Sequence, residues 1–376
     1  MGWDYIDVIL FTGDAFIDHP SFGTAVIARW LQKHGYRVAV VPQPNWRDDL
    51  RDFRKLGAPR LYFGVNSGAM DSMVNHYTAA KRLRSDDAYT PEGKSGQRPD
   101  YAVTVYTKIL KEIYPDIPVV IGGIEASLRR VTHYDYWQDR LKPSILVDSG
   151  ADWLCYGMGE RTMIEFTRAI EAGRNLSDIR KIPQLGFYMD GKCRLKDAVI
   201  LNSYERCSKD KVAFAENFHV VETYANMLQP PVLVEPVGKG YVQINPTWPP
   251  ATQEEMDSFW DLPYTKLPHP RYKGKHIPAF EMIKFSVNTH RGCFGGCNFC
   301  TIAAHQGKFI QSRSEESIIR EITALNKLPG FAGNISDVGA PTANMYGMKG
   351  KDPELCAKCR RKSCLFPGPC RNMDRS

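Results

Sequence analysis

The chain has 376 residues, of which 43% are hydrophobic and 24% are charged, and its formal net charge is +7. These values are ordinary for a folded protein in water, and the length allows two or more domains. No run approaches the roughly 18 apolar residues that a membrane span needs. The first residues also lack the basic and then apolar pattern of a secretory signal. The sequence therefore predicts a cytoplasmic protein with no membrane partner.

Strands and helices alternate along residues 1–175. Short apolar runs bounded by glycine or proline predict the strands, and apolar residues at helical spacing predict the helices. The expected strands are 8–11, 37–41, 60–65, 117–121 and 153–156, and the expected helices are 22–34, 101–113 and 162–172. This alternation predicts an α/β fold with a parallel sheet and helices on both faces.

Four of these strand ends carry glycine, at Gly13, Gly64, Gly122 and Gly157. Ligands of parallel sheets bind beyond the carboxyl ends of the strands, so this edge is a candidate binding edge. A cobalamin ligand loop would carry an Asp-x-His-x-x-Gly string. Here Asp18 and His19 are adjacent, so the string is not matched and we expect no cobalamin.

Residues 176–280 read as an irregular extension followed by a connector. Strands are expected at 198–201 and 241–244, and a helix within 212–227. Proline recurs at positions 246, 249, 250, 263, 268, 270 and 278, which favours an extended connector.

Three cysteines follow at C-x3-C-x2-C spacing, after an apolar run at 283–287 that predicts a strand. Cys293, Cys297 and Cys300 lie in a glycine-rich loop that can turn sharply and approach a ligand closely. Three thiolates in eight residues suit one face of a cubane iron–sulfur cluster and leave one iron without a protein ligand. A zinc knuckle is the alternative, but it would require a fourth ligand and paired C-x2-C arms.

This motif, with Phe299 before the last cysteine, resembles the cluster motif of radical S-adenosylmethionine (SAM) enzymes. The resemblance implies that Cys293, Cys297 and Cys300 hold a 4Fe-4S cluster whose open iron binds SAM. It further implies that Phe299 packs beside the adenine, and that cleavage of SAM yields a deoxyadenosyl radical that abstracts hydrogen from a substrate.

Longer strings resemble the YgiQ-type family of uncharacterised radical SAM proteins. They include residues 290–300, 305–308 and 311–318 around the motif, and 12–15, 18–23, 122–129 and 341–346 elsewhere. The resemblance implies a flavodoxin-like or cobalamin-binding-like domain at 1–175, the irregular part at 176–280, and the start of a radical SAM (β/α) barrel at 281–376.

After the motif, Ser314 is the expected N-cap of a helix with acidic residues in its first turn, and a strand is expected at 333–338. That strand leads into Gly339, Ala340, Pro341 and Thr342. In radical SAM barrels a glycine-rich turn at this place contacts the SAM amino group, so the resemblance assigns these four residues to SAM binding. The family pattern has a glycine pair followed by an acid, and this chain departs from it at Ala340.

Only 76 residues follow Cys300. An eight-unit barrel takes about 250 residues, so a six-unit barrel would take roughly 190. We therefore expect the barrel to be incomplete on this chain, which would be truncated relative to the family and inactive on its own.

A second cysteine group lies at Cys356, Cys359, Cys364 and Cys370. Seven of the ten cysteines thus follow residue 290, which favours metal ligation over disulfides. The four tail cysteines could hold zinc or a second iron–sulfur cluster, or they could be a loop of reduced thiols.

The leading interpretation is a radical SAM enzyme that uses a 4Fe-4S cluster and SAM. Its electron donor would be of the flavodoxin or ferredoxin type, and its substrate and catalytic residues are unknown. The alternatives are a metal-stabilised RNA-binding module, or a radical SAM enzyme that modifies RNA. Nucleic acid has weak support, because the net charge is small and aromatics near the tail are sparse. Three histidines (His269, His290 and His305) could orient the cluster, and Arg291 or Arg313 could pair with the SAM carboxylate.

Overall fold

The computed structural model describes residues 2–340 and 342–374. The chain groups into two compact units, Met1–Asp190 with Leu262–Lys284, and Gly191–Asp261 with Phe285–Ser376. The three-part domain division of the sequence analysis stays a prediction.

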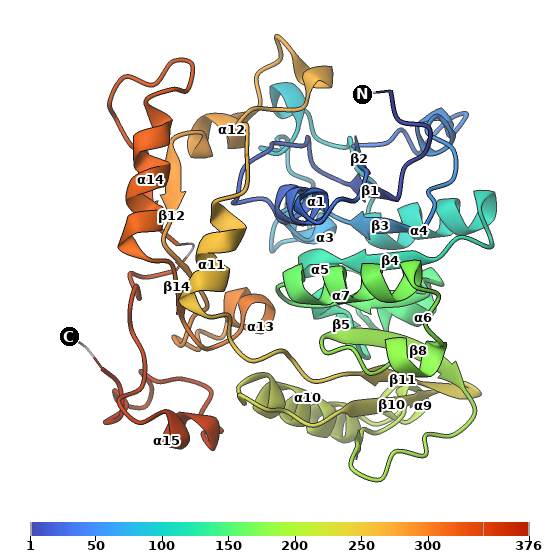
Figure 1. The fold of residues 1–376 in the computed structure, drawn as a ribbon. Coiled ribbons are helices and arrows are strands. Elements are labelled where there is room, and N and C mark those ends of the chain that lie inside the picture. The colour runs from blue at the N-terminus through green and yellow to red at the C-terminus, as the bar shows by residue number, and fades with distance from the viewer. Residues whose placement is uncertain (1, 341, 375–376) are drawn as a thin grey trace. The chain divides into compact units, whose positions relative to one another are not determined.

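The first unit contributes six strands to a sheet, in the order β2-β1-β3-β4-β7-β8. Its strands are β1 (Val8–Thr12), β2 (Val38–Pro42), β3 (Tyr62–Asn66), β4 (Val119–Gly122), β7 (Trp153–Cys155) and β8 (Leu185–Asp190). The first five are parallel and β8 is antiparallel to β7. The parallel part has the flavodoxin-like strand order, which confirms the predicted α/β fold class (Figure 1).

Two groups of helices cover the sheet. Helix α1 (Gly23–Lys33) packs on α7 (Glu160–Glu171), and α4 (Ala102–Ile113) packs on α2 (Arg51–Arg54) and α6 (Ile145–Ser149). Right-handed crossovers run outward from β1 in opposite directions, so the two groups lie on opposite faces.

Strand β1 shows why the sheet holds both helix groups. Its five residues are all buried, and alternate side chains of a strand point to opposite faces. Leu10 belongs to the core cluster that contains Leu31 of α1 and Phe166 of α7. Phe11 points the other way and stacks on Phe53 of α2 with ring centroids 5.1 Å apart. The near-continuous apolar strand is thus explained by burial on both sides.

The remaining elements of the first unit are short. They are α3 (Ser72–His76), η1 (Pro91–Gly93), α5 (Gly123–Leu128), β5 (His133–Asp135), β6 (Arg140–Lys142), α8 (Leu176–Ile179), η2 (Pro270–Tyr272) and α12 (Pro278–Ile283). Helix α12 overturns part of one expectation, because residue 283 ends a helix and does not begin the strand before the cysteine motif. Pro278 at its first position suits a helix start.

The glycines at the carboxyl edge of this sheet serve close packing. A Cβ on Gly13 would lie 2.3 Å from the Ser67 carbonyl oxygen, and one on Gly64 would lie 2.6 Å from Leu10 Cδ2. The edge also holds a buried ion cluster of Asp14, Asp87 and Arg98. The expectation that this edge binds no cobalamin stays a prediction.

The strands of the second unit pair in three groups. In one, β10 (Leu233–Val237) lies between β11 (Gly240–Ile244), which is antiparallel to it, and β9 (Val199–Ile200), which is parallel. The others pair β12 (Ser286–Asn288) with β15 (Asp337–Gly339) in parallel and β13 (His290–Arg291) with β14 (Gln311–Ser312) antiparallel. Its helices are α9 (Tyr204–Cys207), α10 (Lys211–Ala225), α11 (Gln253–Trp260), α13 (Ile302–Gln306), α14 (Glu315–Leu325) and α15 (Pro353–Ala357).

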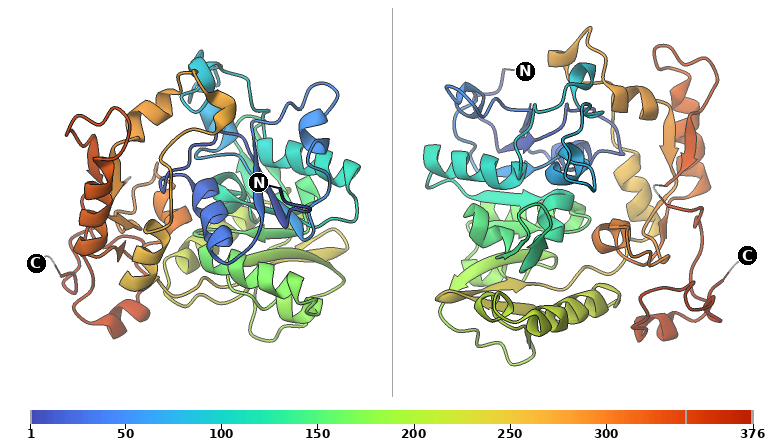
Figure 2. Two further views of the ribbon diagram at one scale, coloured as in Figure 1. Left: turned by 45° about the horizontal axis from the view of Figure 1, so that its top comes forward. Right: turned by 180° about the vertical axis from the view of Figure 1, so that it is seen from behind.

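The connection between the parallel strands β12 and β15 passes through the cysteine loop and then α14, so the two strands and this helix form a βαβ unit, as the start of a (β/α) barrel requires. Ser314 caps α14 as expected, since its side chain accepts from the Ser317 N–H. After β15 the chain is mostly loop and carries only α15 among the described residues (Figure 2, red).

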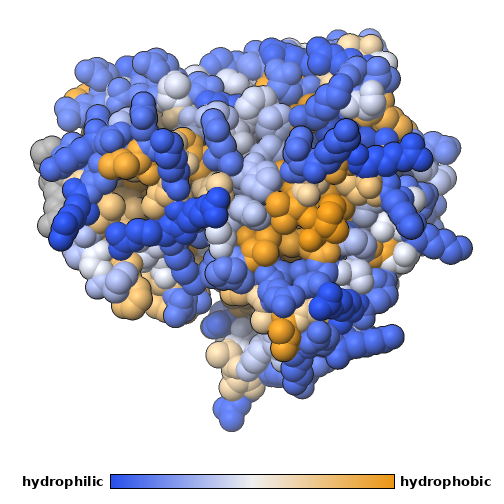
Figure 3. Space-filling model, turned by 90° about the horizontal axis from the view of Figure 1, so that it is seen from below, coloured by the Kyte–Doolittle hydropathy of each residue, from blue (hydrophilic) through white to orange (hydrophobic). Residues whose placement is uncertain are grey.

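Helix α10 leaves Val212 and Phe218 65% and 59% exposed. Figure 3 shows apolar atoms gathered within a largely hydrophilic face. Within the described residues, no helix has the length and apolar content to cross a membrane.

Candidate metal centre

The approach to the cysteine loop is fixed by two strand pairs of the second unit. Strand β12 pairs in register with β15, with Asn288 opposite Gly339. The ladder continues one residue further, because the Thr289 N–H donates to the Gly339 carbonyl at 2.7 Å. Strand β13 then turns the chain against β14. The loop therefore starts from a backbone that is hydrogen-bonded on both sides.

Two glycines let the loop fold against its neighbours. Gly292 has φ +94°, and a Cβ there would lie 2.2 Å from the Phe309 carbonyl oxygen. Gly296 has φ +67°, and a Cβ there would lie 2.8 Å from Ser363 Cβ. Both positions combine a left-handed backbone with close backbone packing, so only glycine fits without displacement. The glycines thus allow the loop to pack closely against Phe309 on one side and Ser363 on the other.

The three motif thiols are free and reachable. Cys297 is exposed, and Cys293 and Cys300 are half-buried. Gly295 lies between two of them, since a Cβ on it would be 3.4 Å from Cys293 Sγ and 3.7 Å from Cys297 Sγ. These sulfurs therefore converge on one side of the loop, whereas the N–H of Cys300 returns to the Cys297 carbonyl at 3.2 Å.

Among the described residues, no three His, Cys, Asp or Glu side chains form a group that could hold a single metal ion. A tetrahedral zinc site needs all its sulfurs at about 2.3 Å from one point. A cubane is larger, because each thiolate binds a different iron. Cys293, Cys297 and Cys300 supply one free thiol for each of three irons, and binding would have to bring the sulfurs into place.

The residues assigned to SAM by resemblance lie in two places. Phe299 sits in the cysteine loop with its side chain 91% exposed, so a stacking partner would approach it from solvent. Gly339 is the last residue of β15, Ala340 and Thr342 follow it, and Ala340 forms an isolated bridge with Thr342. Pro341 lies outside the described residues, so its assignment stays a prediction.

His290 connects that turn to the cysteine loop. Its Nδ1 lies 2.9 Å from Thr289 Oγ1, and its Nε2 lies 3.3 Å from Thr342 Oγ1. Burial lowers the pKa of His290, so the ring is neutral near pH 7. The histidine therefore holds the turn after β15 beside the start of the loop. His269 has a local role in the first unit, where its Nδ1 accepts from the Arg271 N–H at 3.2 Å.

The two arginines considered as SAM carboxylate partners differ. Arg313 is fully buried, and all five of its N–H groups have partners. They donate to Asn288 O at 2.7 Å, Glu321 Oε2 at 2.5 Å, Ser317 O at 2.9 Å, and Ser317 Oγ at 2.8 and 3.2 Å. The carboxylate role is therefore wrong for Arg313. Arg291 is buried and stacks over the Trp260 ring at 4.5 Å.

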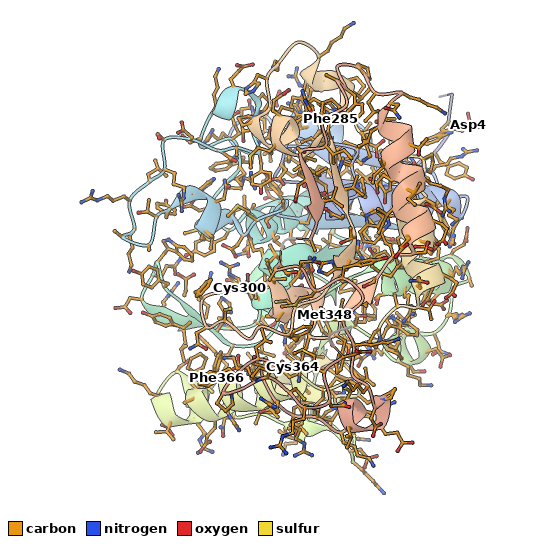
Figure 4. All side chains as sticks on the ribbon, turned by 90° about the vertical axis from the view of Figure 1, so that its left-hand side faces the viewer. Asp4, Phe285, Cys300, Met348, Cys364 and Phe366 are labelled. Carbon is orange, nitrogen blue, oxygen red and sulfur yellow. The ribbon has the colours of Figure 1, made fainter. Side chains whose placement is uncertain are left out.

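The cysteine-rich tail packs directly on the cysteine loop. The Cys364 N–H donates to Phe294 O at 3.0 Å, and Ser363 Oγ donates to Gly295 O at 2.7 Å. Lys362 Nζ lies 3.2 Å from Asn298 Oδ1. Figure 4 labels Cys300 of the loop and Cys364 of the tail. The two cysteine groups, 56 residues apart in sequence between Cys300 and Cys356, thus belong to one structural region.

Sequence reasoning missed two residues of this region. Lys308 is 4% exposed and contacts the tail through Cys359 Sγ at 3.6 Å and the Arg361 carbonyl. Ser363 is equally buried and bonds to the loop backbone. Neither has a sequence signal of its own, although Lys308 follows Gly307 in one of the strings that carry the family resemblance.

Replacing Gly292 with alanine is expected to reduce cluster assembly several-fold and to destabilise the second unit. The added Cβ would collide with the Phe309 carbonyl, which is rigid backbone. Gly330 is a matched control, because it also has positive φ but nothing within 4 Å of its Cβ position, so Gly330→Ala costs only about 1–2 kcal/mol of backbone strain. Iron content after anaerobic reconstitution and thermal unfolding measure the difference. Equal effects of the two substitutions would contradict the close packing at Gly292.

Comparison with known proteins gives a consistent result. A family model described as Radical SAM N-terminal matches residues 1–286. Proteins named UPF0313 are 55% identical in Bacteroides thetaiotaomicron and 56% identical in Porphyromonas gingivalis, each over 99% of this chain. The chain spans 62% and 59% of the length of those relatives. One similar solved structure is that of the radical S-adenosylmethionine methyltransferase TsrM from Kitasatospora setae, with cobalamin and a [4Fe-4S] cluster bound. The alignment has a TM-score of 0.47 and 17% sequence identity, and it covers 90% of this chain and 48% of TsrM.

Proposed function

Because the chain belongs to the radical SAM N-terminal family, we propose that Cys293, Cys297 and Cys300 hold a 4Fe-4S cluster whose open iron binds SAM. The observation that carries this proposal is the loop itself. The loop presents three free thiols, two of which lie close to Gly295. Gly292 and Gly296 allow its backbone to pack closely against neighbouring segments. A reduced cluster of this kind supplies the electron that cleaves the sulfonium of SAM and yields a deoxyadenosyl radical.

The residues around the loop have supporting roles in this proposal. His290 is neutral and orients Thr342, so the turn at Gly339–Thr342 is held beside the loop without adding a positive charge. Phe299 offers an exposed ring for the adenine. The Gly339 carbonyl already accepts a hydrogen bond from the Thr289 N–H. This carbonyl therefore has a structural role in the strand pair.

The electron donor would be a small protein of the flavodoxin or ferredoxin type, and the substrate is an unidentified molecule that loses hydrogen to the radical. The chain spans about three fifths of its curated relatives. The activity, substrates and partners of the whole protein are therefore proposals as well.

The test is the response of the cluster to SAM. The chain would be reconstituted anaerobically with iron and sulfide, reduced, and examined by electron paramagnetic resonance with and without SAM. We expect a spectrum that changes on addition of SAM, because SAM completes the coordination of the open iron. Cys297→Ala should abolish the response, whereas Cys193→Ala, a half-buried cysteine outside both groups, should retain it. The proposal would be overturned by a bound cluster whose spectrum does not change when SAM is added. It would also be overturned if Cys297→Ala kept the full spectral response to SAM.

A further inference from the structure

The four tail cysteines form a group that the function proposed for the loop does not use. Cys370 donates its N–H to the Cys364 carbonyl at 2.7 Å, and Cys359 donates its N–H to the Cys356 carbonyl at 3.1 Å. Asn372 Nδ2 lies 3.3 Å from Cys356 Sγ, and the N–H of the next residue, Met373, donates to the Cys370 carbonyl at 3.1 Å. These contacts hold the four cysteines in one region of the tail, and the group spans 15 residues from Cys356 to Cys370.

A buried cation faces this group. Lys308 is 4% exposed and its Nζ lies 3.6 Å from Cys359 Sγ. Within the described residues, no Asp or Glu forms an ion pair with it, and its other partner is the neutral Arg361 carbonyl. Burying an ammonium without an anion is costly. Neutral thiols would leave it uncompensated, whereas thiolates on a metal centre would supply the missing negative charge.

N–H donors also point at two of the sulfurs. The Arg361 N–H lies 3.4 Å from Cys359 Sγ, and Asn372 Nδ2 lies 3.3 Å from Cys356 Sγ. A Cβ on Gly350 would lie 2.3 Å from Cys356 Sγ, so the backbone approaches this sulfur closely as well. Hydrogen bonds that orient ligands from behind are typical of metal sites.

We propose that Cys356, Cys359, Cys364 and Cys370 bind a second iron–sulfur cluster through four thiolates, with Lys308 as its buried counter-charge. Four cysteines are the usual ligand set of such clusters. Among the described residues, no three of these sulfurs form a group that could hold a single metal ion. All its irons would have protein ligands, so this cluster would be closed to SAM.

The tail cluster has a structural consequence for the loop. Ser363 and Cys364 bond to the loop carbonyls at Phe294 and Gly295. Ligation of Cys364 would therefore fix the segment that holds the loop. The tail cluster would thereby also restrain the loop that holds the first cluster.

The test separates the two clusters by substitution. In Cys293→Ala/Cys297→Ala/Cys300→Ala the tail is intact, so iron and acid-labile sulfide that remain after anaerobic reconstitution belong to the tail. We expect about four irons per chain to remain if the cluster is a cubane. Alkylation of that variant with N-ethylmaleimide should spare the four tail cysteines until a chelator removes the iron. Adding Cys359→Ala and Cys370→Ala should abolish both the iron and the protection.

Two results would overturn the proposal: no iron in the triple variant with freely alkylated tail thiols, or one zinc ion and no iron. Lys308→Met is expected to lower iron retention several-fold, and Lys351→Met, at an exposed lysine, should not. Failure of the SAM response in the unsubstituted chain would sink only the function proposed for the loop, because the triple variant reports on the tail alone.

Discussion

Arg98→Leu is expected to lower the free energy of unfolding by about 3–5 kcal/mol, the cost of leaving buried charges without their partner. Arg98 is fully buried at the carboxyl edge of the first sheet. Its Nη1 lies 2.7 Å from Asp14 Oδ1 and 2.8 Å from the Ser67 carbonyl oxygen, and its Nη2 lies 3.0 Å from Asp87 Oδ2. One guanidinium thus serves two buried carboxylates, so its loss leaves both without a counter-charge.

The effect of Arg98→Leu should depend on pH. Burial already raises the pKa of Asp14 to about 6, although Arg98 lowers it. Without Arg98 this folded-state pKa rises further above the unfolded value, so stability is lost as the pH rises. We therefore expect a smaller deficit at about pH 5, where the carboxyl groups take up protons, than at about pH 8.

Urea unfolding of the first unit, followed by tryptophan fluorescence, measures this prediction. Arg168→Leu is the matched control, because Arg168 and its partner Glu165 are 52% and 41% exposed and such pairs contribute about 0–1 kcal/mol. Adding Asp14→Asn and Asp87→Asn to Arg98→Leu should recover part of the loss. A deficit that is the same at both pH values, or equal to that of Arg168→Leu, would contradict the assigned role.

The first unit was predictable because its strands carry a strong local signal. Strand β1 was expected at 8–11 and is Val8–Thr12, and α7 was expected at 162–172 and is Glu160–Glu171. Burial on both faces makes such strands continuously apolar, and this is visible without any knowledge of the partners. Strand β8 was missed, and only its first three residues are fully buried.

The second unit was harder for a physical reason. Its strands are two to five residues long, and such short segments have little periodicity. Helix α11 was missed although Thr252 and Glu255 form a capping box, because the proline-rich surroundings favoured an extended connector. The spacing of the cysteines identified both candidate metal groups. Lys308 had no such signal, since its importance comes from burial beside a segment 51 residues away.

Arg313→Leu is expected to abolish cluster assembly on the loop and to destabilise the second unit by about 3–5 kcal/mol. Arg313 joins the end of β12 to α14, through Asn288 on one side and through Ser317 and Glu321 on the other. The Glu321 side chain is only 9% exposed. Leucine would leave this carboxylate and two backbone carbonyls without their donor, and β12 leads directly to His290 and the loop.

Arg320→Leu is the control on the same helix, because Arg320 and its partner Asp261 are 56% and 39% exposed. Iron content, thermal unfolding and the spectral response to SAM should all fall in Arg313→Leu and stay near the unsubstituted values in Arg320→Leu. If Arg313 acted on the SAM carboxylate instead, Arg313→Leu would keep its iron and its stability and would lose only the response to SAM. All five N–H groups of Arg313 already have partners, so the side chain cannot bind a ligand without breaking the junction between β12 and α14. We therefore expect Arg313→Leu to lose iron, stability and the response to SAM together.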